Sequence, residues 1–125
     1  MLFVYGTLRK GGRNRHLVDQ DVKSTTTALA TGTLFIHGRS AFFSSHGNTK
    51  IAGELLHLFD ENEVLGRLDE FEGPEYKRRA IEVVTEEGRE CAWAYLYFSA
   101  ATPRDATIIR DGDWIAYCSK RSLDA

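Results

Sequence analysis

Most of the chain alternates between apolar and polar residues with the two-residue period of β-strands. The alternating segments are rich in Thr, Val, Ile, Tyr and Trp, and turns that contain glycine separate them. In the last segment, RECAWAYLYFS, both faces are apolar, so we expect this strand to be covered on both sides. The predicted strands are residues 2–5, 25–38, 49–59, 76–88 and 89–99.

Residues 60–73 follow the period of an α-helix instead. Asp60 at the N-cap and Glu63 three residues later form a capping pair, and both acids favour the positive end of the helix dipole. Gly73 and Pro74 end the helix. Residues 12–20 predict a further turn or two of helix, with Leu17 and Val18 as its apolar contacts.

Five strands, glycine turns and one good helix predict an α+β fold, a closed or nearly closed mixed β-barrel flanked by one or two helices. No repeat, linker or low-complexity run interrupts the pattern, which indicates a single domain over residues 1–125. The mouth of such a barrel is the natural place for a site.

One face of the predicted helix carries an acid among apolar residues. At roughly 100° per residue, the apolar side chains share an arc about 120° wide that must face the barrel. Glu72 lies inside this arc, whereas Asp69 and Glu70 point toward water. Burial and the negative end of the helix dipole would raise the pKa of Glu72, which suits a general acid/base. The apolar members of the arc are Val64, Leu65, Leu68 and Phe71.

The plainer interpretation of Glu72 also stays open at this point. A glutamate at a frayed helix end can reach solvent or pair with Arg78 or Arg79, because carboxylates with shifted pKa values also occur in ordinary ion-pair networks.

Composition and charge restrict the class of protein. Apolar residues make up 42% of the chain and charged residues 27%, as in ordinary globular proteins. The net charge of -2 gives no general attraction to nucleic acid or acidic lipid. Cys91 and Cys118 form no CxxC pair, and we expect both to be buried thiols. The chain shows no signal peptide and no apolar stretch of membrane-spanning length, which predicts a cytoplasmic protein without a membrane partner.

The loop GTLRKGGR after the first strand is a second candidate site. It is not a nucleotide-binding loop, because Arg13 stands where a Ser or Thr hydroxyl is required. Gly6 is free to take a positive φ, and the backbone N–H groups after it could converge on an anion or an oxyanion. A plain turn at the end of the strand is the alternative. A solvated loop is favoured over a nucleic-acid contact for the basic residues Arg9, Lys10, Arg13, Arg15 and His16.

Other polar residues predict no further site. The four histidines have no close metal-ligand spacing, so no metal site is expected. Ser44 and Ser45 stand beside His46 without a G-x-S-x-G motif, and we interpret them as residues of a turn.

Taken together, several motifs resemble the gamma-glutamylcyclotransferase-like superfamily, in the short-chain branch that includes gamma-glutamylamine cyclotransferases. The resemblance covers most of the chain, and its motifs occur in the family's order and roughly its spacing. The motifs are VYGTLRKGGRN at the start, GTLF (32–35), IAGELLHL (51–58), LDEFEGPEYKRR (68–79) and GDW (112–114).

This resemblance implies a β-barrel with flanking helices and a cavity for a gamma-glutamyl group. Glu72 corresponds to the family's acid/base glutamate, and Tyr76 and Arg78 match the pattern that follows it, as substrate contacts or as braces for Glu72. The implied reaction releases 5-oxoproline and an amine or amino acid, and it needs no cofactor. The resemblance assigns the lining of the cavity to Tyr5, Gly6, Thr7 and Leu8.

One stretch departs from the family pattern, and two other functions stay open. Residues 37–50 lack the proline that the family usually carries there, which leaves the size of the accepted leaving group unassigned. The first alternative is a non-catalytic protein that binds a small metabolite in the same cavity. The second is a nucleic-acid module, with binding that depends on salt and on Arg13.

Overall fold

The computed structural model describes all residues from 1 to 125. Six strands and two α-helices follow one another along the chain, with two single-turn 3₁₀ helices after the first strand. The strands are β1 (Leu2–Val4), β2 (Val22–His37), β3 (Ser40–Leu58), β4 (Tyr76–Thr85), β5 (Gly88–Tyr97) and β6 (Thr107–Ile108). The helices are η1 (Arg15–Leu17), η2 (Asp19–Asp21), α1 (Glu61–Glu72) and α2 (Trp114–Lys120).

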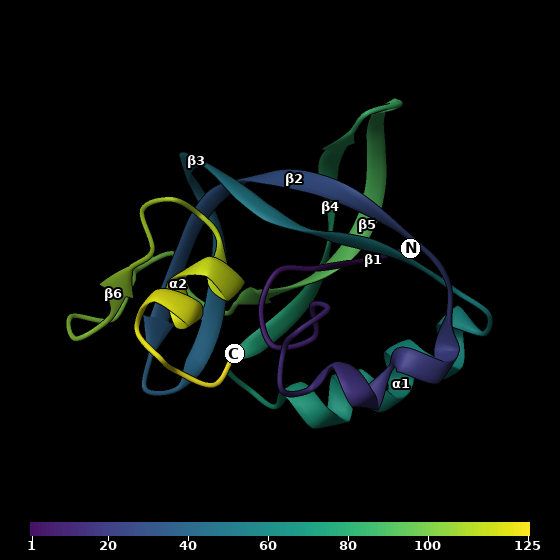
Figure 1. Ribbon diagram of the computed structural model, residues 1–125, viewed down its shortest axis with the longest axis horizontal. Helices are drawn as coiled ribbons and strands as arrows, with labels where there is room; N and C mark the ends of the chain where they lie inside the picture. The colour runs from purple at the N-terminus through teal and green to yellow at the C-terminus, as the bar shows by residue number, and fades with distance from the viewer.

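Five of the strands close a ring of hydrogen bonds. The order in the sheet is β3-β1-β5-β4-β2-β6, and β2 also pairs with β3, so only β6 lies outside the ring. β1 and β5 run parallel, and the other neighbours run antiparallel. The shortest strand pairings consist of one register pair each: Leu2 with Trp93 between β1 and β5, and Leu29 with Val84 between β2 and β4. The prediction of a closed or nearly closed mixed barrel is confirmed (Figure 1).

Two apolar clusters lie on opposite sides of the barrel wall, because successive side chains of a strand point to opposite faces. Phe3 of β1 belongs to the cluster inside the barrel, whereas Leu2 and Val4 belong to the cluster that includes α1. In β5, Ala94 points inside and Tyr95 points toward α1. The expectation that this strand is covered on both sides is therefore confirmed over its central residues.

Helix α1 packs its apolar face on the outer cluster, as predicted. Val64, Leu65 and Leu68 are buried, and burial of such a side chain contributes about 1.5–3 kcal/mol. The expectation for Phe71 was wrong, since its side chain is 48% exposed. Phe71 and Glu72 lie roughly 100° apart on the helix, and the barrel covers only the Glu72 side of the last turn.

The ends of α1 follow the sequence signals. The Asp60 side chain accepts a 3.3 Å hydrogen bond from the backbone N–H of Glu63, which confirms the N-cap. Gly73 ends the helix with φ +78°, a conformation that favours glycine. The helix therefore ends at Glu72, and β4 begins at Tyr76.

Two further expectations need correction, and one helix had no sequence prediction of its own. Ser44 and Ser45 lie within β3, not in a turn, because β3 begins at Ser40 and pairs with β2 from there. Cys91 is exposed near the β4–β5 turn, while Cys118 is buried as expected. The second helix, α2, has seven residues, too few to show a clear period, and the sequence pattern did not indicate it.

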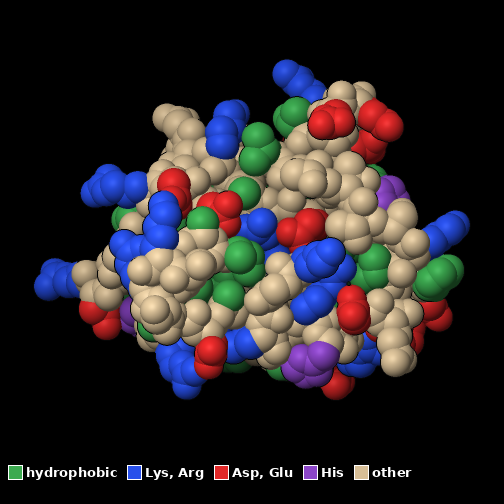
Figure 2. Space-filling view, viewed as in Figure 1, with side chains coloured by type: hydrophobic (Ala, Val, Ile, Leu, Met, Phe, Trp, Pro, Cys, Tyr) green, Lys and Arg blue, Asp and Glu red, His purple; other side chains and the backbone are tan.

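Neither helix combines the length and apolar character needed to cross a membrane. Figure 1 shows α1 on one side of the barrel, beside the loop that follows β1. It shows α2 near the part of the β2–β3 hairpin that lies farther from α1. On the face seen in Figure 2, basic and acidic side chains are interspersed.

Candidate active site

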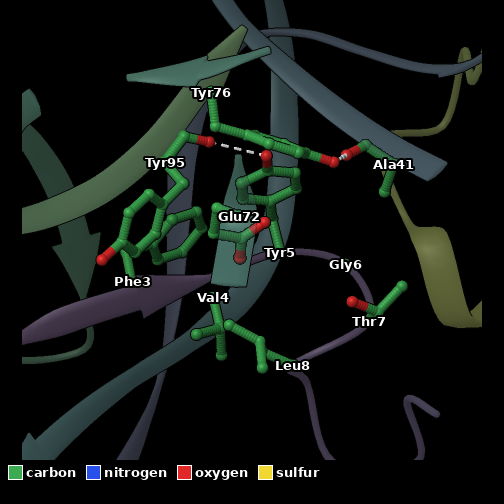
Figure 3. Close-up of a pocket in the computed structure, with 10 residues that line it drawn as sticks. All are labelled: Phe3, Val4, Tyr5, Gly6, Thr7, Leu8, Ala41, Glu72, Tyr76 and Tyr95. Carbon is green, nitrogen blue, oxygen red and sulfur yellow. Dashed lines mark hydrogen bonds between the residues drawn. The ribbon is translucent and has the colours of Figure 1, made fainter. Parts of the chain in front are cut away.

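A pocket opens where β1 ends and α1 stops. It holds about 330 Å³ of empty space, its open mouth included. The residues after β1 form one wall, and Glu72 enters from the last turn of α1 (Figure 3). The lining consists of Phe3, Val4, Tyr5, Gly6, Thr7, Leu8, Ala41, Glu72, Tyr76 and Tyr95.

The Glu72 carboxyl is the group in this pocket whose ionisation changes near neutral pH. Burial raises its pKa from 4.5 to about 7, because the charged form loses solvation. Arg78 and Arg79, the partners considered from the sequence, make no ion pair with it: Arg78 pairs with Asp69. The expected rise in pKa is therefore due to desolvation.

Two tyrosine hydroxyls beside Glu72 are held by backbone carbonyls. The Tyr5 hydroxyl donates to the carbonyl of Tyr95 at 2.6 Å, and the Tyr76 hydroxyl donates to that of Ala41 at 2.8 Å. Burial raises the pKa of both phenols, and the nearby Glu72 charge raises it further. Both tyrosines therefore stay neutral at physiological pH, and their hydroxyl protons are already used in hydrogen bonds to backbone carbonyls.

The loop wall of the pocket owes its shape to close packing at Gly6. A Cβ atom at this position would lie 2.7 Å from the Cβ of Ala41, so only glycine fits. Gly6 does not use its freedom to take a positive φ, since it is not among the glycines with this conformation. The backbone N–H groups of Gly6, Thr7 and Leu8 donate no hydrogen bond within the protein, so they are free to bind a polar ligand.

The expectation of a solvated basic loop was wrong for Arg9 and Arg15, which are anchored by ion pairs, whereas Lys10 and His16 are exposed. Glu54 of β3 accepts from Arg9 at 2.8 Å, from Arg15 at 3.3 Å and from the backbone N–H of Lys10 at 2.9 Å. The Arg9 and Arg15 side chains are each 14% exposed, and Glu54 is 12% exposed. Arg9 also pairs with Asp113, the N-cap of α2, at 2.9 Å. This network fixes the loop relative to β3 and α2.

Arg78 lies outside the pocket. Its guanidinium pairs with Asp69 and stacks over the Trp93 ring, 4.6 Å from the ring centre. Asp69 in turn accepts a 2.7 Å hydrogen bond from the Tyr95 hydroxyl, so it does not simply point toward water as the helical period suggested. Of the two residues that follow the helix in the family pattern, Tyr76 lines the pocket, whereas Arg78 lines a neighbouring open hollow that Glu72 and Tyr76 also line.

Four lining residues were not predicted: Phe3, Val4, Ala41 and Tyr95. The alternation of residues 89–99 had placed Tyr95 on an apolar face, which was the available signal. Ala41 carried no signal, because its position depends on the pairing of β3 with β2.

A family model described as "Gamma-glutamyl cyclotransferase, AIG2-like" matches residues 2–116. The chain belongs to this family. The matched span includes the loop after β1 and Glu72. Within the family, the chain is 32% identical over 118 residues to the Bacillus subtilis protein named "Putative gamma-glutamylcyclotransferase YkqA". That alignment covers 91% of this chain but only 40% of the relative's length.

Solved structures of similar proteins have the same fold. The crystal structure of YkqA from Bacillus subtilis has a TM-score of 0.77 at 31% identity and covers 97% of this chain and 41% of that one. The NMR structure of ytfP from Escherichia coli has a TM-score of 0.66 at 26% identity, covering 93% and 96%. An AIG2-like mouse protein has a TM-score of 0.67 at 23% identity, covering 82% and 78%, which shows the shared fold alone.

Proposed function

We propose that the protein is a gamma-glutamyl cyclotransferase that converts a gamma-glutamyl amine or dipeptide into 5-oxoproline and a free amine or amino acid. One observation carries this proposal: a carboxyl group without an ion-pair partner, with a pKa of about 7, lies in a pocket beside a loop with free N–H groups. Membership of the family supports the same reaction.

The reaction takes place within one substrate molecule. The α-amino nitrogen of the gamma-glutamyl group attacks its side-chain carbonyl carbon, and the new C–N bond closes a five-membered ring. The original amide C–N bond breaks, and its nitrogen leaves as the amine. Atoms and electrons balance without a second substrate, so the protein has to fold the substrate, stabilise the oxyanion and move protons.

Glu72 is the group that moves the proton. As a carboxylate it accepts a proton from the attacking amine, and as a carboxylic acid it donates a proton to the leaving nitrogen. Its pKa of about 7 lies roughly one unit below that of an α-amino group, so transfer between them costs about 1.4 kcal/mol. An exposed glutamate would be a far weaker base.

The loop binds the polar end of the substrate. Tyr5, Gly6, Thr7 and Leu8 line the pocket, and the unpaired N–H groups of the last three can donate to a carboxylate or to the developing oxyanion. The network around Glu54 keeps this loop in place without using the free N–H groups.

The test is to incubate the purified protein with a panel of gamma-glutamyl amines and dipeptides and to detect 5-oxoproline by mass spectrometry. We expect release from at least one compound, and a loss of about 10²–10⁴-fold in Glu72→Gln, the range that general acid–base catalysis contributes. Glu70→Gln is the matched control, because Glu70 is exposed on the same helix.

The same panel separates catalysis from binding alone. A protein that only binds a metabolite would bind a compound of the panel equally well in wild type and Glu72→Gln, with no 5-oxoproline from either. Equal turnover by wild type and Glu72→Gln would show that Glu72 does not carry the proton.

A further inference from the structure

Asp69 holds the end of α1 against two strands. Its carboxylate accepts two hydrogen bonds from the Arg78 guanidinium on β4, at 2.9 Å from Nε and 3.1 Å from Nη2. It also accepts a 2.7 Å hydrogen bond from the Tyr95 hydroxyl on β5. A bidentate pair of this kind fixes the orientation of both side chains.

Tyr95 links this contact to the opposite wall of the pocket. Its backbone carbonyl accepts the Tyr5 hydroxyl bond at 2.6 Å, while its own hydroxyl donates to Asp69 at 2.7 Å and lies 3.3 Å from the carbonyl oxygen of Leu65, also on α1. Figure 3 shows the Tyr95 hydroxyl directed away from Glu72. One residue therefore connects the start of the loop with the helix that carries Glu72, and its hydroxyl is engaged outside the pocket.

Little apolar burial holds the last turn of α1, because residues 69–71 are exposed and only Glu72 is partly buried. Leu68 is the last buried apolar residue of the helix, Phe71 is largely exposed, and Gly73 follows with a positive φ. Helix ends without tertiary contacts fray, because their last carbonyl groups have no partner within the helix. Asp69 stands one turn before Glu72, between Leu68 and the exposed end.

We propose that Asp69 is a positioning residue, whose contacts with Arg78 and Tyr95 fix the last turn of α1 and aim the Glu72 carboxyl into the pocket. The kinetic part of this inference rests on the proposed function. The structural part does not, because the direction and hydration of Glu72 can be measured in the free protein.

The surroundings of Glu72 make it sensitive to this positioning. Tyr5, from the end of β1, and Tyr76 of β4 line the pocket with Glu72 and are neutral at physiological pH. Tyr95 of β5 is neutral as well, and its hydroxyl is directed away from Glu72 (Figure 3). A neighbouring open hollow that Glu72 also lines contains Asp69 and the basic residues Lys77, Arg78 and Arg79 of β4, none of which forms an ion pair with Glu72. Arg78 is paired with Asp69. The pKa of Glu72 therefore depends on its desolvation, and a frayed last turn would admit water and return that pKa toward 4.5.

The experiment uses Asp69→Asn, Tyr95→Phe and the control Glu70→Gln. Tyr95→Phe removes only a hydroxyl and changes no charge, so it separates positioning from the direct electrostatic effect of Asp69. For each protein, three quantities are measured: the melting temperature, the pKa of Glu72 by carbon-13 NMR of its carboxyl, and kcat and KM on a compound that the wild type converts.

We expect the pKa of Glu72 to fall in Asp69→Asn and in Tyr95→Phe, and to stay at the wild-type value in Glu70→Gln. We expect kcat to fall about 10- to 100-fold with a smaller change in KM, the size of effect that misplacement of a reacting group produces. If Asp69→Asn does not fold, Tyr95→Phe alone decides.

A wild-type pKa of Glu72 and a wild-type kcat in Tyr95→Phe would overturn the inference. This holds even if Asp69→Asn shifts the pKa of Glu72, because a shift seen only when the Asp69 charge is removed is a direct charge effect. If no compound is converted by the wild type while the pKa still falls in both variants, the positioning stands and the proposed reaction fails.

Discussion

The hydroxyl of Tyr5 donates a 2.6 Å hydrogen bond to the backbone carbonyl of Tyr95 and so joins the end of β1 to β5 at the wall of the pocket. The strand pairing between β1 and β5 consists of the single register pair Leu2 with Trp93. A buried side-chain hydrogen bond therefore reinforces a short joint of the barrel beside the site.

Removing this hydroxyl should destabilise the protein. In Tyr5→Phe the Tyr95 carbonyl loses its donor, which costs about 1–3 kcal/mol for a buried acceptor. Urea denaturation measures this change. Tyr117→Phe is the matched control, because the Tyr117 ring keeps its contact with the Arg121 guanidinium without the hydroxyl. Equal stability of Tyr5→Phe and wild type would show that this bond contributes nothing.

The buried Glu72 carboxyl should make the fold less stable as the pH rises. Its pKa is higher in the folded protein than in the unfolded chain, so the folded state favours the protonated form. The resulting loss of stability begins above pH 4.5 and is complete above pH 7. The unfolding free energy of Glu72→Gln relative to that of the wild type should therefore rise by about 3 kcal/mol as the pH increases from 4.5 to 7.

Urea denaturation of wild type and Glu72→Gln at several pH values between these limits measures that gain. A difference between the two proteins that does not change with pH would mean that Glu72 titrates alike in the folded and unfolded states. The pKa shift would then be absent.

Glu54 should be essential for the loop after β1. Glu54→Gln removes the carboxylate that Arg9 and Arg15 share, although Arg9 keeps its pair with Asp113 and Arg15 its pair with Asp19. We expect a loss of about 1.5–3 kcal/mol, the net contribution of hydrogen bonds to charged groups. Hydrogen exchange should accelerate at the amide of Lys10, which donates to Glu54. Glu63→Gln is the control, since its pair with Arg67 is exposed and worth about 0–1 kcal/mol. Similar effects of the two substitutions would contradict this role.

Glycine should be required at Gly6 and dispensable at Gly66. Gly6→Ala places a methyl group 2.7 Å from the Cβ of Ala41, and overpacking of this kind costs about 1–3 kcal/mol. The double variant Gly6→Ala with Ala41→Gly should recover part of this loss. Gly66→Ala meets no atom within 4 Å on the exposed side of α1 and should stabilise the protein by about 1 kcal/mol. Thermal denaturation distinguishes these outcomes, and an unchanged Gly6→Ala would refute the packing argument.

Local signals in the sequence were sufficient for α1 and for the direction of Glu72. The caps at Asp60 and Gly73 and the helical period lie within fourteen consecutive residues of the sequence, so no distant partner is needed to read them. The same period failed for Phe71, because it gives angles around the helix and not the extent of the surface that covers it.

Long-range pairs were beyond the reach of these patterns. The sequence contained Arg9, Glu54 and Asp113 but gave no sign that they meet, so the loop was expected to be solvated. The strand at Ser44 was missed because serine and glycine near it are typical of turns, and its pairing with β2 overrides that preference. The helical period assigned Asp69 to solvent. It could not show the contacts with Arg78 and Tyr95, because these residues lie on other elements.

The pKa of Glu72 in the wild-type protein is the most direct measure of whether this carboxyl can act as the acid/base of the pocket. Carbon-13 NMR of glutamate carboxyls over a pH series provides it, and Glu72→Gln identifies the signal. We predict a titration midpoint of about 7. A midpoint near 4.5, the value of an ordinary glutamate, would show that the carboxyl is fully hydrated and would contradict the proposed role of Glu72.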